Sequence, residues 1–205
     1  MMKNITLLVL LLLATPQSRA QSLSNLFKGL FGSGRTETVE SKPKGPKYPS
    51  AAMLAGTWIY NDLIVDYTGG DMLAKMAVSA LRGQAADLAA KMGLQAGRDK
   101  VRWTDKGRVT LEMGDKSLDA TYKYMPATGT MELTLRSGDR TATFRGTAEQ
   151  TAGGELRLTF DATDCMRVIR TVAPEAMQNS YFKTLNAIVE QYPGLRGGCK
   201  LTREG

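Results

Sequence analysis

The stretch Gly56-Thr57-Trp58-Ile59-Tyr60 opens the first regular element of the chain, directly after a segment rich in glycine, proline and lysine. From Trp58 the chain alternates to about Tyr67, which is the period of a β-strand with two distinct faces. The alternation assigns one face of the strand to Trp58, Tyr60, Asp62, Ile64 and Asp66. Thr68-Gly69-Gly70 then ends it. We interpret this stretch as the first strand of a sheet whose other members lie further along the chain.

The most regular part of the chain contains six short alternating segments, from Val101 to Phe160. Glycine-containing turns separate them, among them Asp105-Lys106-Gly107, Gly114-Asp115 and Ser137-Gly138-Asp139. The face that we assign to the interior carries no charge and consists of Val101, Trp103, Val109, Leu111, Met113, Leu118, Tyr122, Tyr124, Met131, Leu133, Phe144, Leu156, Leu158 and Phe160. Six strands joined by tight turns predict an antiparallel meander.

Helical spacing interrupts the strands. Three helices are predicted: Asp71 to about Met92 with a weak point at Gly83, Asp161 to Val172, and Pro174 to about Gln191. A short run from Leu195 to Thr202 supplies an eighth strand. The predicted fold is therefore mainly β, an antiparallel eight-stranded barrel with a helical insertion after the first strand and two helices before the last. Pairing the last strand with the first would remove both open edges of the sheet.

The N-terminal 20 residues have the features of an export signal. Lys3 is the positive end, residues 5–14 are an apolar run too short to span a bilayer, and Ser18 and Ala20 are small residues at the cleavage positions. No cysteine follows the cut, so a lipid anchor is not expected. We expect a mature chain that begins near Gln21 and is periplasmic or secreted, with a barrel domain over residues 51–205.

Residues 21–50 form a separate segment. Five apolar residues lie at helical spacing, which predicts a short amphipathic helix: Leu23, Leu26, Phe27, Leu30 and Phe31. The helix could dock on a membrane surface or an envelope partner, or pack back on the domain. Residues 32–50 read as a basic linker. Of the formal charge of +7, residues 51–205 carry only +2, so a nucleic-acid partner is not expected.

The chain contains no histidine, which removes Ser-His-Asp and Cys-His chemistry and most zinc sites. We therefore expect no metal, no cofactor and no enzymatic activity. Two local patterns resemble catalytic ones. Ser180 to Lys183 fits S-x-x-K without its companion motifs, and Asp62 with Asp66 could form a carboxylate pair. In an oxidising compartment the two cysteines, Cys165 and Cys199, are expected to form a disulfide.

The order of these features resembles a family of secreted lipocalin-like domains of unknown function from gut Gram-negative bacteria. The resemblance covers roughly residues 50–203 and rests on Gly56-x-Trp58, the helix insertion, the meander, Phe160-Asp161-Ala162 before the helix pair, and the final Lys200-Leu201. It implies a lipocalin-like barrel and assigns no substrate. It also implies that Arg203 stacks on Trp58. The inserted helices leave open whether the barrel mouth is covered.

Two functions remain. In the first, the barrel binds a small hydrophobic or amphipathic ligand in the cell envelope, through tyrosine hydroxyls, a tryptophan N–H and apolar rings; the candidate ligand-binding residues are Trp103, Tyr122, Tyr124, Phe144 and Phe160. In the second, the core is solid and the protein is a structural or interaction protein of the envelope that docks through residues 23–31. An apolar interior fits both functions equally well. Gly56 and Trp58 fix the fold, and Trp58 is expected to seal the closed end of the barrel.

Overall fold

The computed structural model describes residues 47–82, 86, 89–90, 93–114, 116–178 and 180–205. The proposed signal, the amphipathic segment and the linker up to residue 46 lie outside the described residues. In chain order the elements are α3 (Ala51–Leu54), β1 (Gly56–Tyr67), α4 (Met72–Arg82), β2 (Lys100–Trp103), β3 (Arg108–Met113), β4 (Lys116–Met125), β5 (Thr130–Ser137), β6 (Arg140–Gln150), β7 (Leu156–Asp161), α6 (Ala162–Val172), the 3-10 helix η2 (Pro174–Gln178), α7 (Ser180–Gln191) and β8 (Leu195–Arg203).

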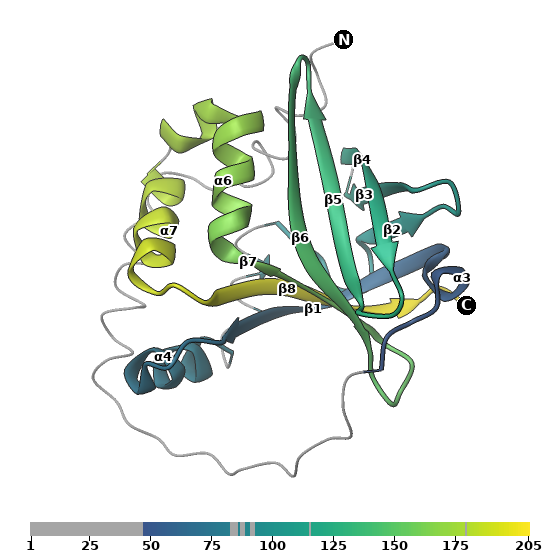
Figure 1. Cartoon of the computed structure of the whole chain (residues 1–205), viewed down its shortest axis with the longest axis horizontal. Helices are drawn as coiled ribbons and strands as arrows, with labels where there is room; N and C mark the ends of the chain where they lie inside the picture. Colours follow the sequence, from purple (N-terminus) through teal and green to yellow (C-terminus); the bar gives the residue numbers. More distant parts are fainter. Residues whose placement is uncertain (1–46, 83–85, 87–88, 91–92, 115, 179) are drawn as a thin grey trace.

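The strands form one closed antiparallel barrel in sequence order, from β1 to β8 (Figure 1). Closure comes from the last strand, since β8 pairs with β7 on one side and with β1 on the other. The β1–β8 ladder runs from Trp58 opposite Arg203 to Tyr67 opposite Leu195, along almost the full length of both strands. The predicted eight-stranded barrel with a helical insertion after β1 is confirmed.

The predicted faces of β1 are wrong beyond Tyr60. Tyr60 lies opposite Leu201, whereas Leu63 lies opposite Cys199, so the register shifts between Tyr60 and Asp62. Residues that face each other in an antiparallel ladder point to the same side, and Leu201 and Cys199 are two positions apart on one side of β8. A β-bulge therefore keeps Tyr60 on the inner face and turns Asp62 outward. The inner face of β1 continues with Leu63, Val65 and Tyr67.

The helices differ from prediction in one place. The single helix expected from Pro174 to Gln191 is two elements, η2 and α7, and the tight 3-10 turn buries Ala173 and Ala176 completely. Helix α6 begins where predicted, since the Asp161 carboxylate accepts hydrogen bonds from the backbone N–H groups of Thr163 (2.9 Å) and Asp164 (3.1 Å). The insertion after β1 contains α4, and residues 83–92 are described only in part.

One end of the barrel is sealed by the segment before β1. Helix α3 lies beside the C-terminus (Figure 1), and the Trp58 indole N–H donates to the Leu54 carbonyl oxygen at 2.9 Å. The guanidinium carbon of Arg203 lies 5.9 Å from the Trp58 ring centroid, and its Nη2 donates to the Ala55 carbonyl oxygen at 2.9 Å. The expected arginine–tryptophan stack is present. Trp58 is only 2% exposed, so it seals this end, as predicted.

The strands separate at the opposite end, which we call the flared end. Pairing of β4 with β5 covers only Thr121–Met125 and Thr130–Thr134, and pairing of β6 with β7 begins at Gly146. Helices take over where the ladders stop (Figure 1): α6 packs on β6, and α4 packs on β1. Arg167 of α6 donates to the Thr143 carbonyl oxygen at 2.8 Å, and Arg82 of α4 donates to the Val65 carbonyl oxygen at 2.9 Å. Helices thus cover the strand edges that the flare opens.

Neighbouring glycines on β8 provide a test of the closure. A Cβ atom at Gly198 would lie 1.9 Å from the Leu158 carbonyl oxygen, whereas a Cβ atom at Gly197 would meet nothing within 4 Å. Gly198→Ala should push β8 away from β7 and lower the free energy of unfolding by about 1–3 kcal/mol, while Gly197→Ala should change it by less than about 0.5 kcal/mol. Urea unfolding measures both. Equal losses for the two variants would contradict the described packing of β8 against β7.

Candidate functional site

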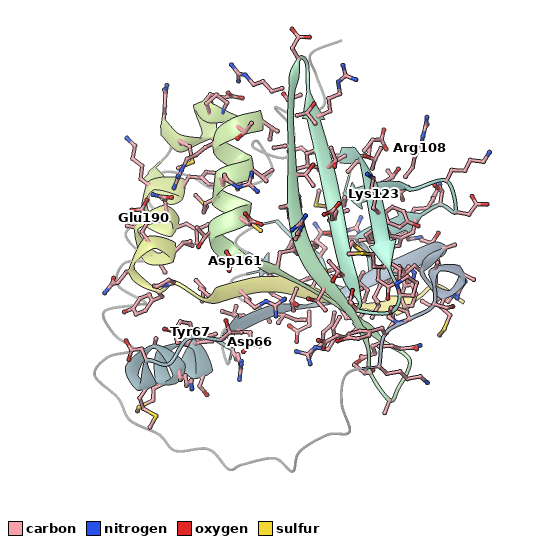
Figure 2. The ribbon with its side chains drawn as sticks, viewed as in Figure 1. Asp66, Tyr67, Arg108, Lys123, Asp161 and Glu190 are labelled. Atoms are coloured by element: carbon pink, nitrogen blue, oxygen red, sulfur yellow. The ribbon has the colours of Figure 1, made fainter. Side chains whose placement is uncertain are left out.

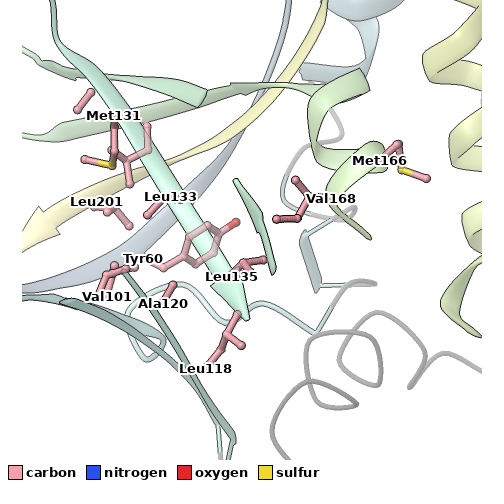
Figure 3. Close-up of a cluster of buried hydrophobic side chains, with 14 of the residues drawn as sticks. Tyr60, Val101, Leu118, Ala120, Met131, Leu133, Leu135, Met166, Val168 and Leu201 are labelled. Carbon is pink, nitrogen blue, oxygen red and sulfur yellow. The ribbon is translucent and has the colours of Figure 1, made fainter. Parts of the chain in front are cut away.

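The hydroxyl group of Tyr60 is a buried polar group without a hydrogen-bond partner among the described residues. Tyr60 is 5% exposed, and its ring lies in the barrel interior, with the hydroxyl directed to the side on which Val168 of α6 lies (Figure 3). A buried hydroxyl left unpaired costs stability, and native proteins pair nearly all such groups with protein, water or ligand. The Tyr60 hydroxyl is therefore an unused hydrogen-bonding group between the sealed end, where Leu201 faces Tyr60, and the flared end.

The surroundings of Tyr60 keep this group neutral. Burial, followed by the nearby Cys199, Asp62 and Asp99, raises the pKa of Tyr60 to about 12. The phenol thus stays protonated and is a hydrogen-bond donor at physiological pH. Burial likewise raises the pKa of the Cys199 thiol, on the inner face of β8, to about 12. The hydroxyl and the thiol are therefore neutral polar groups, and the carboxylates near the hydroxyl, those of Asp62 and the buried Asp99, would repel an anion.

Three of the five predicted ligand-binding residues lie toward the sealed end, where each has a structural contact. Trp103 packs edge-on against Tyr122, with ring centroids 4.8 Å apart. The hydroxyl of Tyr122 donates to the Thr104 carbonyl oxygen at 2.7 Å, and that of Tyr124 donates to the Pro49 carbonyl oxygen at 2.8 Å. These two tyrosines hold the turn after β2 and the segment before α3 against the barrel.

Trp103 contributes a second unpartnered donor. Its indole Nε1 has no hydrogen-bond partner in the part of the chain that the structure describes, although the residue is 3% exposed. Trp103 lies opposite Gly56, and Gly56 precedes Tyr60 by four positions on β1. The interior therefore holds two buried donors from strands that neighbour each other, and both lack acceptors among the described residues.

The other two predicted residues, Phe144 and Phe160, pair with each other on neighbouring strands. Their ring centroids are 5.0 Å apart with the planes tilted by 58°. Both are only partly buried and pack against the main core. They lie on the inner face where β6 and β7 separate, beside α6. Sequence reasoning thus placed all five residues on the inner face, and the structure divides them between its two ends.

Packing changes along the interior. Toward the sealed end the inner side chains are completely enclosed, with Met131, Leu156 and Leu201 all at 0% exposure. Toward the flared end several inner side chains are only partly buried: Leu63, Val65, Tyr67, Phe144, Phe160 and Cys199. A side chain at 0% exposure leaves no room for a ligand beside it, which disfavours a binding site at the sealed end; at the flared end Leu118, Leu135 and Ala142 are also buried, at 3–7% exposure.

The carboxylates considered as a catalytic pair do not act together. Asp62 pairs with Lys200, at 3.3 Å between Oδ2 and Nζ, whereas Asp66 pairs with Arg82 of α4. Both bridges are partly solvent-exposed on the outer face, where ion pairs contribute little. The side chain of Ser180 lies outside the described set. Among the described residues no cluster of three or more cysteine, aspartate or glutamate side chains could hold a metal ion.

The predicted disulfide is absent: Cys165 and Cys199 are both free thiols. Cys199 is carried by the inner face of β8, and Cys165 by the first turns of α6, which places them on different elements with no bond between them. Burial and, after it, the Asp161 and Asp164 carboxylates raise the pKa of Cys165 to about 12. The expectation from cysteine number and compartment is wrong because the fold does not bring the two cysteines within disulfide-bonding distance.

The sequence matches the model of one known protein family. A model of the family described as "Lipocalin-like domain (DUF4923)" matches residues 30–203. The chain belongs to this family. No curated protein and no solved structure matches the chain. Membership of the lipocalin-like family agrees with the closed eight-stranded barrel. The interior of a barrel of this size either holds one small ligand or is filled by side chains.

No helix in the described ranges has the length and apolar character needed to cross a membrane.

Tyr60 was missed as a site residue because the strand alternation was followed through Asn61 and Asp62 without interruption. The sequence does contain a signal. Apolar residues occupy Trp58 and Tyr60, and they then return at Leu63, one position out of phase. A phase shift of this kind, at two polar residues inside one strand, indicates a bulge.

The state of the cysteines predicts a simple chemical result. A buried thiol with a raised pKa holds little thiolate near neutral pH, and the thiolate is the reactive form. Dithionitrobenzoate should therefore react slowly with the folded protein and should titrate two thiols per chain after unfolding in guanidinium chloride, matching the two free cysteines. An unfolded chain that yields no thiol until a reductant is added would contain the disulfide and contradict the structure.

Proposed function

We propose that this lipocalin-like protein binds a small hydrophobic or amphipathic molecule on the inner face of the flared end of its barrel. The observation that carries the proposal is the Tyr60 hydroxyl, a neutral donor that is buried and unpartnered among the described residues. Inner residues labelled with it in Figure 3, such as Ala120, Leu133 and Leu135, are apolar and buried, and Leu63, which follows it on the inner face of β1, is partly buried. Apolar walls with a few placed polar groups are the usual composition of small-molecule sites.

The chemistry of the site defines the ligand class. Tyr60 can donate one hydrogen bond, and the inner residues that the structure describes at the flared end include no cation that would favour an anionic head group. The expected ligand therefore has an apolar body and a neutral acceptor, such as an ester or ketone carbonyl. Helices α6 and α4, which cover the flared end, would enclose it.

The alternative function is that of an envelope interaction protein with a solid core. Complete burial at the sealed end, at Met131, Leu156 and Leu201, favours it. Its proposed docking segment, residues 23–31, lies outside the described residues. The two functions differ in what they require of Tyr60. In a ligand-binding barrel the hydroxyl donates a hydrogen bond to the ligand. In a solid core it stays buried without a partner, which lowers the stability of the fold.

Tyr60→Phe tests this difference. A fatty-acid methyl ester that displaces the neutral fluorescent probe N-phenylnaphthylamine should bind the variant roughly tenfold more weakly, since one hydrogen bond is lost. The free energy of unfolding of the ligand-free variant should stay the same or rise by about 1 kcal/mol, because an unpaired buried hydroxyl has been removed.

Tyr124→Phe is the matched control. Its hydroxyl is bonded to the Pro49 carbonyl oxygen near the sealed end. This variant should lose about 1 kcal/mol of stability and keep the ester affinity of the parent protein. If no ester displaces the probe, or if Tyr60→Phe binds the ester as tightly as the parent, the interior site is rejected and the solid-core function is favoured.

We also propose that the chain is exported to the periplasm or beyond and processed before Gln21. Lys3, the apolar residues 5–14 and Ala20 support this. Mass spectrometry of the protein from cell fractions should find it outside the cytoplasm with Gln21 at its N-terminus. A chain that keeps Met1 and stays in the cytoplasmic fraction would overturn the proposal.

A further inference from the structure

A polar groove lies on the outer face of the barrel, separate from the interior site. It has a volume of about 370 Å³ and is lined by Thr68, Thr130, Arg145, Thr147, Asp161 and Arg196, together with the backbone of Gly146. In the β5–β6 and β6–β7 ladders Thr130 lies opposite Thr147, and Thr147 lies opposite Thr159. These positions alternate with inner residues such as Met131 and Phe160, which places the groove on the solvent side.

Arg196 is held at the groove by hydroxyl groups rather than by a carboxylate. Its Nη2 donates to Thr159 Oγ1 at 2.9 Å, to Thr147 Oγ1 at 3.2 Å and to the Thr159 carbonyl oxygen at 3.4 Å. Arg196 makes no ion pair with any described residue, and no described residue accepts a hydrogen bond from its Nε or Nη1. The guanidinium is thus fixed in place and keeps free donors.

The carboxylates beside Arg196 in the sheet are occupied elsewhere. Asp66 and Asp161 flank Arg196 on the neighbouring strands. Asp66 pairs with Arg82 of α4. Asp161 uses Oδ1 to cap α6, through the backbone N–H groups of Thr163 and Asp164. Both lie near the end of β1 in the centre of the molecule (Figure 2). The second oxygen of Asp161 remains as an acceptor at the groove wall.

Arg145 supplies a second guanidinium. Its Nε donates to Glu132 Oε1 at 2.8 Å, and the arginine side chain is 75% exposed. The bond to Glu132 uses the Nε edge and leaves the two terminal nitrogens without a described partner. The lining of the groove thus includes two arginines, three threonines and one aspartate, with Arg145 ion-paired to the neighbouring Glu132.

We propose that this groove binds a small carboxylate that also bears several hydroxyl groups, as a sugar acid does. The planar guanidinium groups match a carboxylate in charge and geometry. The threonine hydroxyls and the free oxygen of Asp161 can exchange hydrogen bonds with ligand hydroxyls. Asp161 opposes a ligand of high negative charge, which disfavours phosphate. A volume of about 370 Å³ lies at the small end of ligand sites, and the site is independent of the interior one.

Calorimetric or NMR titration of the whole protein tests the assignment with three probes. Glucuronate should bind saturably and more weakly as salt is added. Glucose, which has the hydroxyls without the charge, and inorganic phosphate, which has the charge without the ring, should each bind at least about tenfold more weakly.

Variants locate the site. Arg196→Gln and Arg145→Gln should each weaken glucuronate binding by about tenfold or more. Arg108→Gln is the charge-matched control, because Arg108 is an exposed residue on β3 that does not line the groove and lies to the right of Asp161 in Figure 2. The affinity of this control should equal that of the parent. Arg145 is mostly exposed, so its substitution tests the groove even if Arg196→Gln fails to fold.

Three results would overturn the proposal. Glucose binding as tightly as glucuronate would show that the arginines do not recognise a carboxylate. Phosphate binding as tightly as glucuronate would show that any small anion suffices. The absence of saturable binding, or an equal loss in the Arg108→Gln and Arg145→Gln variants, would remove the site itself. None of these results bears on the interior site, whose test uses an apolar ester and Tyr60.

Discussion

Pairing of the first strand with the last is the interaction on which the rest of this structure depends. The β1–β8 ladder closes the barrel, and the Trp58–Leu54 hydrogen bond with Arg203 over the indole seals one end. Closure removes the sheet edges and buries an uncharged inner face. Without it neither the enclosed interior nor the outer groove would exist, because the groove is built from β5 to β8 and the residue that follows β1.

The sequence predicted the features that repeat along the chain. Alternation and glycine turns gave the strands, and Gly56-Thr57-Trp58 marked where the first one begins. It did not predict single-residue irregularities: the bulge after Tyr60 reversed the assigned face of Asp62, and the helix predicted from Pro174 to Gln191 is divided in two. The disulfide was predicted from the number of cysteines and the expected compartment. Neither determines the distance between Cys165 and Cys199 in the fold.

Both candidate sites depend on register, which is why composition and period did not reveal them. The bulge after Tyr60 turns Asp62 outward and leaves Tyr60 among apolar inner residues, and the groove requires that Thr147, Thr159 and Arg196 meet from three different strands. On the pattern alone Arg196 and Arg145 are ordinary solvated residues. The two sites suit opposite chemistries, since the interior offers neutral donors among apolar side chains and the groove is lined by two arginines and by threonines.

The central claim is that the sealed half of the barrel is solid and the flared half holds a ligand at Tyr60. A high-resolution crystal structure of the protein purified from the cells that make it tests this most directly. We expect density for a small molecule whose acceptor lies within hydrogen-bonding distance of the Tyr60 hydroxyl, on the side of Val168 of α6, with none beside Met131 or Leu156. An interior filled by side chains, with at most a water molecule on Tyr60, would contradict it.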